Sequence, residues 1–82
     1  MNIKVGKVTH YYDHIGVAVV AVVKTIKVGD RIKISGHDKE FTQEVDSLQM
    51  DLKPIKRAKS KTSVGLKVTQ SVKENDEVYK VG

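Results

Sequence analysis

Alternation of apolar and polar residues is the main structural signal in this chain. Between residues 31 and 35, Ile32 and Ile34 alternate with polar side chains, and the pair Gly29-Asp30 precedes them. A period of two places both isoleucines on one face of a strand. The segment therefore predicts a short antiparallel strand with one face buried and the other facing water.

Comparable segments follow one another along the whole chain, and none has an apolar stripe at helical spacing. The predicted strands, separated by short polar turns, cover residues 2–11, 15–23, 31–35, 40–50, 63–70 and 77–81. Short strands at this spacing are typical of a barrel or sandwich. We predict an all-β fold: a single closed six-stranded antiparallel β-barrel with Greek-key connections, formed by residues 1–82.

Two irregularities qualify the simple alternation. Gly6 interrupts the first strand, as at a bulge, and the apolar face of residues 40–50 changes side between Val45 and Leu48. Residues 15–23 are apolar on both faces and rich in β-branched side chains, which favours a strand covered on two sides. The predicted core consists of Val5, Val8, Val17, Val19, Ile32, Ile34, Val45, Leu48, Val64, Leu66, Val68 and Val78.

The composition of the chain excludes several classes of protein. The chain has 82 residues, enough for one small domain, and no cysteine, which excludes a disulfide or thiolate site and fits a reducing cytoplasm. No secretory signal precedes the first strand. The longest apolar run, residues 15–23, is far shorter than the roughly 20 residues that a membrane-spanning helix needs. We therefore expect a cytoplasmic protein without a membrane partner.

The positive charge is concentrated in one segment. The net charge is +5, and residues 53–61 contain five cations and no acid. Such a stretch is a candidate nucleic-acid-binding surface, although it lacks an aromatic residue for base stacking. The alternative is a solvated loop that keeps the protein soluble. The candidate residues are Lys53, Lys56, Arg57, Lys59 and Lys61.

The motifs of catalysis are missing from the sequence. Neither a Walker-type phosphate loop nor a G-x-G-x-x-G is present, and no serine lies in a nucleophile elbow. His10, Asp13 and His14 could ligate zinc, but a polar hairpin tip is the simpler explanation, because the sequence offers no obvious further fixed ligand. The sequence therefore predicts a protein that is not an enzyme and has neither a metal nor another cofactor.

Two tyrosines lie at the same predicted hairpin. Tyr11 and Tyr12 are adjacent, so in a strand they point to opposite faces. One would plug the end of the core, and the other would be exposed. Together with His14, they are candidate contacts for a partner.

The order of motifs resembles that of a known family. Gly6-Lys7-Val8, the apolar strand Ile15–Val23, the segment Ile26–Gly36, the segment Ala58–Leu66 and Asp76-Glu77-Val78 follow in the order found in domain 2 of translational GTPases. Elongation factor Tu and initiation factor 2 are of this type. The chain also resembles short elongation factor-like proteins and the barrel that ends some U32 peptidases.

One position departs from that family's pattern. The family has a glycine three residues after the alanine of the Ala58 segment, where this chain has Lys61. Glycine adopts positive φ freely, so either Lys61 accepts that backbone geometry or the turn differs.

The resemblance implies a monomeric, non-catalytic binding module associated with translation. Its partner would be RNA or a ribonucleoprotein, contacted through the basic residues 53–61. The alternative implied by the U32 proteins is a protein–protein module that docks on a separately encoded enzyme of the peptidase type.

Overall fold

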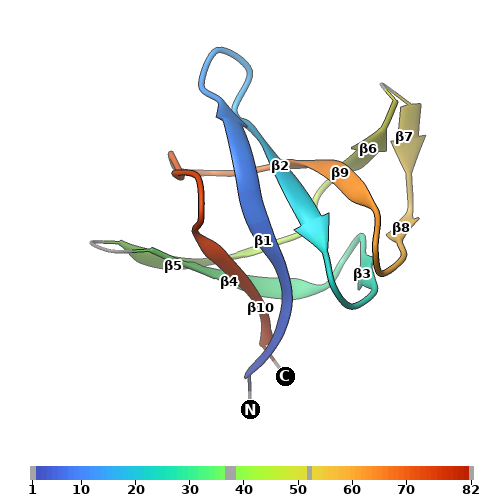
Figure 1. The fold of residues 1–82 in the computed structure, drawn as a ribbon, viewed down its shortest axis with the longest axis horizontal. Coiled ribbons are helices and arrows are strands. Elements are labelled where there is room, and N and C mark those ends of the chain that lie inside the picture. The colour runs from blue at the N-terminus through green and yellow to red at the C-terminus, as the bar shows by residue number, and fades with distance from the viewer. Residues whose placement is uncertain (1, 37–38, 52, 82) are drawn as a thin grey trace.

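The computed structural model describes residues 2–36, 39–51 and 53–81, which form strands, turns and loops and no helix (Figure 1). Ten strands are present in this part of the chain. Their bounds are β1 (Asn2–Tyr12), β2 (Val17–Val22), β3 (Ile26–Lys27), β4 (Arg31–Ser35), β5 (Glu40–Glu44), β6 (Leu48–Met50), β7 (Lys53–Ile55), β8 (Arg57–Ala58), β9 (Ser63–Lys67) and β10 (Glu77–Val81). The all-β prediction is confirmed.

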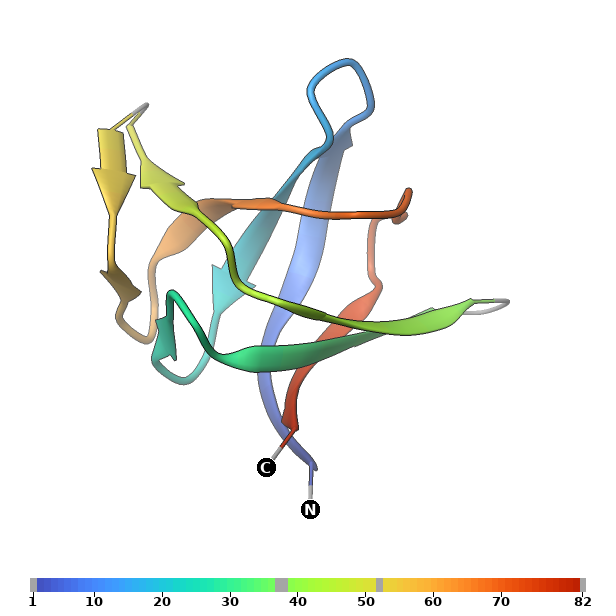
Figure 2. The same ribbon diagram turned by 180° about the vertical axis from the view of Figure 1, so that it is seen from behind.

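Eight strands form one antiparallel sheet in the order β5-β4-β10-β1-β2-β9-β6-β7, and β3 pairs with β8 in a small second sheet. The large sheet is strongly curled. In Figure 1, β1 and β2 lie in front of β4 and β5 and run across them, and Figure 2 shows the same arrangement from behind. Both chain ends lie side by side in the two views.

The predicted closure of six strands into a barrel is not confirmed. The large sheet has two edges, β5 and β7. Pro54 lies in the edge strand β7, the kind of position to which proline is largely confined within sheets. The predicted strand 40–50 is divided into β5 and β6 at the place where the apolar face changes side.

The side chain of Gln43 connects β5 with the end of β9 and the residues that follow it. Gln43 Nε2 donates a hydrogen bond to the Lys67 carbonyl at 2.8 Å, and Gln43 Oε1 accepts one from the Thr69 N–H at 2.8 Å. Gln43 is buried beside the core. Its amide therefore takes the place that ladder hydrogen bonds would occupy in a closed barrel.

The core lies inside the curl of the sheet and is almost entirely aliphatic. Ten of the twelve predicted core residues are buried, but Val17 and Val19 are not. In β2 the inward residues are Ala18, Val20 and Val22, so the predicted orientation of this strand was wrong. Outside β2, the core also includes four residues that were not predicted: Ile26, Phe41, Ala58 and Val72.

Bulges and turns lie where the small residues predicted them. The register of β1 against β10 shifts between Lys4 and Gly6, which confirms the predicted bulge. A Cβ on Gly6 would lie 2.5 Å from Val20 Cγ1, so the close approach of β1 and β2 requires glycine. Gly29 has φ +97 in the turn before β4, and the Asp30 carboxylate accepts a hydrogen bond from the Lys27 N–H at 2.9 Å.

Lys61 adopts positive φ, one of the two possibilities expected for its position. Its φ is +68, in the left-handed region, within the turn between β8 and β9. The Lys61 N–H donates a hydrogen bond to the Val22 carbonyl at 2.7 Å, which holds the turn against the end of β2. The lysine therefore accepts a backbone conformation that glycine adopts more freely.

Candidate binding surfaces

In the structure, two lysines from another part of the chain lie near the basic residues 53–61. All five predicted residues (Lys53, Lys56, Arg57, Lys59 and Lys61) are exposed. Lys27 pairs with Arg57 across β3 and β8, and the Lys61 N–H bonds to Val22, two residues before Lys24. Lys24 and Lys27, both exposed, therefore join the same end of the molecule, which makes seven cations in all.

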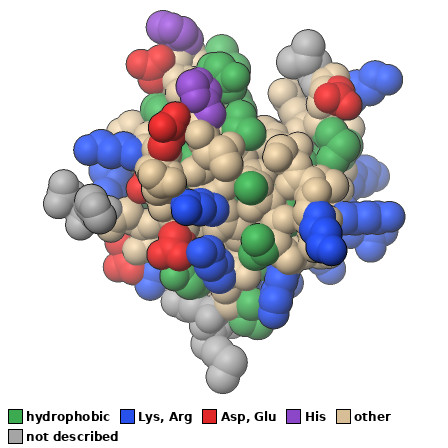
Figure 3. Space-filling model, in the orientation of Figure 1, with side chains coloured by type: hydrophobic (Ala, Val, Ile, Leu, Met, Phe, Trp, Pro, Cys, Tyr) green, Lys and Arg blue, Asp and Glu red, His purple; other side chains and the backbone are tan. Residues whose placement is uncertain are grey.

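This basic surface has a strong local charge. In the described part of the chain, none of the seven cations lies within ion-pair distance of a carboxylate. Figure 3 shows blue side chains along the side of the molecule that β8 and the following turn occupy. Unpaired cations at this density attract anionic partners, whether acidic protein surfaces or phosphates.

The tyrosine pair is divided as predicted. Tyr11 is half-buried and packs against the core, and Tyr12 is exposed on the outer side of the sheet. The Tyr12 ring meets the His10 ring edge to face, with 4.4 Å between the centroids. The other predicted contact, His14, lies fully in solvent at the turn, next to Asp13. The structure therefore does not place His14 beside the tyrosines in a shared site.

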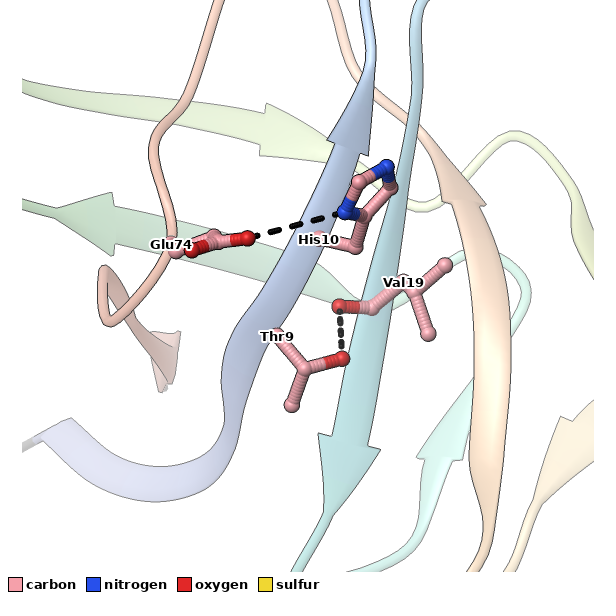
Figure 4. Close-up of polar contacts among 4 residues, drawn as sticks. All are labelled: Thr9, His10, Val19 and Glu74. Atoms are coloured by element: carbon pink, nitrogen blue, oxygen red, sulfur yellow. Dashed lines mark hydrogen bonds and ion pairs between the residues drawn. The ribbon is translucent and has the colours of Figure 1, made fainter.

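Figure 4 shows how β1 positions His10. The register of β1 against β2 shifts between Val8 and His10, and the hydroxyl of Thr9 donates a hydrogen bond to the Val19 carbonyl at 3.3 Å. His10 Nδ1 lies 3.6 Å from Glu74 Oε2 and not beside Asp13. Within the described ranges, no three His, Asp or Glu side chains are close enough to hold a metal ion.

A shallow hollow of about 670 Å³ lies where the end of β4 meets the loop before β10. Lys39 and Lys73 line it together with the carboxylates of Glu74, Asp76 and Glu77. Asp76 is already engaged, because its carboxylate accepts a hydrogen bond from the Lys73 N–H at 2.9 Å and packs against Gly36. The mixture of opposite charges does not define one class of ligand.

Lys4 and Glu77, whose pKa values are shifted, form a structural ion pair. Lys4 Nζ lies 2.8 Å from Glu77 Oε2 on the exposed side of β1 and β10. The hydrogen bond between them lowers the pKa of Glu77 and raises the pKa of Lys4. Both side chains are open to solvent and lie on regular strands, so this pair stabilises strand pairing and does not mark a catalytic site.

Sequence reasoning missed a second surface on the outer side of β2 and β9. A groove of about 320 Å³ is lined by Ile15, Val17, Ser47, Gln49, Gly65 and Lys67. Val17 and Val19 were assigned to the core, so the outer face was not considered. The signal that could have revealed it was the apolar character of both faces of residues 15–23.

The chain has relatives among known proteins, although no family model matches it. An uncharacterised protease of Methanocaldococcus jannaschii is 35% identical over 79 residues, which are 95% of this chain and 19% of that protein. The chain thus spans about a fifth of the length of the curated relative it matches. Within the described residues, no helix is long and apolar enough to cross a membrane.

Two solved structures have the same fold. The C-terminal domain of a Geobacillus thermoleovorans U32 peptidase superposes with a TM-score of 0.91 at 20% identity, covering 98% of this chain and 93% of that domain. The selenomethionine variant of that domain gives a TM-score of 0.86 at 22% identity, with coverages of 92% and 95%. These relatives support the resemblance to the U32 barrel; they do not show the resemblance to translation factors.

Proposed function

We propose that this chain is a non-catalytic protein-docking module whose partner is a polypeptide of the U32 peptidase type. The observation that carries the proposal is the match to the Methanocaldococcus jannaschii protease, in which 79 residues of this type are joined to a much longer chain. A module of this fold also forms the C-terminal domain of a U32 peptidase. A module of this type would contact a peptidase-type polypeptide by binding to its surface.

The chemistry of the chain supports a binding role. Its interior is aliphatic, and the polar group it buries, the Gln43 amide, is used to hold the sheet together. A nucleophile, its base and an oxyanion site must converge for hydrolysis. His10 and His14 instead approach different carboxylates on the surface, those of Glu74 and Asp13.

The basic surface supports RNA as the alternative partner. Seven exposed cations at one end of the molecule would bind phosphates in a strongly salt-dependent way. The relatives described above are peptidase-related, so the protein partner is the better-supported reading.

Affinity capture from the native cell tests both readings. The tagged chain is recovered from extract with and without ribonuclease, and the bound proteins and RNA are identified by mass spectrometry and sequencing. We expect a peptidase-like protein in both arms. Recovery of ribosomal or transfer RNA that disappears with ribonuclease, without such a protein, would replace the proposal by the RNA reading.

A charge variant separates the two readings further. Changing Lys53, Lys56, Arg57 and Lys59 to glutamine removes four positive charges from exposed positions. RNA retention would then fall steeply and lose its dependence on salt. Docking on a peptidase-like protein through another face would persist.

A further inference from the structure

The outer face of β2 is apolar where an exposed strand is normally polar. Val17, Val19 and Ala21 point outward and are half-buried, while Ala18, Val20 and Val22 fill the core. The neighbouring positions across the sheet are Tyr12 on β1 and Gly65 on β9, which pair with Val17 and Val19. We call the outward side of β2 and β9 the β2–β9 face.

A hollow lies on this face because β9 has glycine at its centre. Gly65 pairs with Val19 on one side and with Gln49 on the other. A Cβ on Gly65 would come within 3.1 Å of Val17 Cγ1. With no side chain there, Val17 and Gln49 become the walls of the 320 Å³ groove, and Ile15, 63% exposed, stands at its end.

Charged side chains border the β2–β9 face. In Figure 3 the view shows tan and green areas, with blue, red and purple side chains among and around them. Lys67 lines the groove, and Lys24 and Lys61 lie where β2 ends. An uncharged centre with a charged rim is the usual anatomy of a protein interface. Lys67, Lys24 and Lys61 on the border of the β2–β9 face are complementary to acidic side chains on the partner.

We propose that the β2–β9 face is the surface on which the peptidase-like partner docks. This inference rests on the proposed function and names the site through which it acts. The partner surface inserts an apolar side chain into the hollow above Gly65 and surrounds it with Asp or Glu side chains. Those carboxylates face Lys67, Lys24 and Lys61.

Two matched lysine substitutions test this site. Val19→Lys places a charge at the centre of the face, whereas Thr42→Lys places the same charge on the outer side of β5, where Thr42 is exposed. Both tagged variants are used for capture from the native extract, and the peptidase-like protein is quantified by mass spectrometry. We expect Val19→Lys to lower its recovery at least tenfold, equivalent to about 1.4 kcal/mol of binding free energy, and Thr42→Lys to leave it within about twofold.

A photo-crosslinking experiment covers the case in which Val19→Lys unfolds. A photoreactive amino acid replaces Gln49 on the groove wall or, as control, Thr42. Crosslinks to the peptidase-like protein from position 49 and not from position 42 support the inference. Equal recovery with a folded Val19→Lys, or crosslinks from position 42 alone, overturn it while leaving the proposed function intact.

Two further results would contradict the proposed docking site. If the unmodified chain captures no peptidase-like protein, the proposed function fails and this site fails with it. If sedimentation shows that the purified chain forms a dimer that Val19→Lys dissociates, the face serves a second copy of the chain, and the inference is overturned.

Discussion

The outer faces of β4 and β2 belong to one sheet but differ in kind. Both strands point apolar residues into the same core. On the outside, β4 presents Arg31, Lys33 and Ser35, and Lys33 Nζ forms an ion pair with Glu40 Oε1 of β5 at 2.6 Å. The outer side of β2 instead presents Val17, Val19 and Ala21.

The comparison distinguishes side chains that the fold requires from apolar side chains that it does not require. Alternation with a polar outer face, as in β4, is sufficient to make a stable strand of a half-buried sheet. The outer valines of β2 add no core contacts, because the core lies on the other side. Apolar residues at such positions favour association with another surface, which is the basis for placing the docking site there.

The largest expected effect concerns Gln43, whose side chain joins β5 to the end of β9. Gln43→Leu keeps the size of the side chain but removes the partners of the Lys67 carbonyl and the Thr69 N–H. We expect a loss of about 3 kcal/mol in the free energy of unfolding, because two hydrogen bonds in a partly buried place are lost, each worth up to about 1.5 kcal/mol. Urea unfolding measures it. The neighbouring Thr42→Leu, on the exposed side, should change stability by no more than about 0.5 kcal/mol.

The comparison of inner and outer faces can be tested on β2 itself. Threonine has nearly the shape of valine, so Val20→Thr and Val19→Thr differ mainly in where the hydroxyl is placed. Val20 is fully buried, and its replacement should cost about 2 kcal/mol. Val19→Thr should cost less than about 0.5 kcal/mol. Equal losses in urea unfolding would show that both faces of β2 are buried and would remove the basis of the docking face.

The turn that leads into β9 allows a smaller test. Lys61 has φ +68, and a left-handed backbone costs a non-glycine residue about 1–2 kcal/mol. Glycine loses about 0.5–1 kcal/mol more in conformational entropy on folding. Lys61→Gly should therefore stabilise the protein by up to about 1 kcal/mol in thermal unfolding. Lys59→Gly removes the same charge from the same loop and should destabilise it, since Lys59 does not have positive φ.

The smallest effect is expected for the ion pair between Lys4 and Glu77 on the polar side of β1 and β10. Because folding lowers the pKa of Glu77, the pair contributes stability above the ordinary carboxyl pKa of 4.5, and this contribution is lost as the pH falls through the lower pKa of the folded state. The melting temperature of Glu77→Gln should be slightly below that of the unmodified protein at pH 7. The difference should vanish at pH 2. A difference that stays constant with pH would mean that Glu77 acts by packing.

Local alternation was enough to find most strands. Arg31–Ser35 and Glu77–Val81 are strands with the predicted bounds, and Gly6 is a bulge, because these features depend on neighbouring residues alone. The orientation of β2 could not be found in this way. Its two faces are both apolar, so alternation does not distinguish inside from outside, and only the pairing with β1 and β9 orients it.

The candidate sites were predictable in part. The five cations of residues 53–61 and the opposite directions of Tyr11 and Tyr12 follow from sequence position. The addition of Lys24 and Lys27 depends on the pairing of β3 with β8, a contact between segments about thirty residues apart. The groove at Gly65 requires three strands to meet, which no local pattern describes.

The sequence by itself determined that this is a small all-β chain without cysteine chemistry or a nucleotide-binding loop. Those conclusions rest on residue types and short-range spacing. The tertiary structure decided that the large sheet stays open, with Gln43 spanning the gap, and that the apolar residues facing outward on β2 are Val17 and Val19. These features depend on which strands become neighbours, and long-range pairing is set by packing of the whole core.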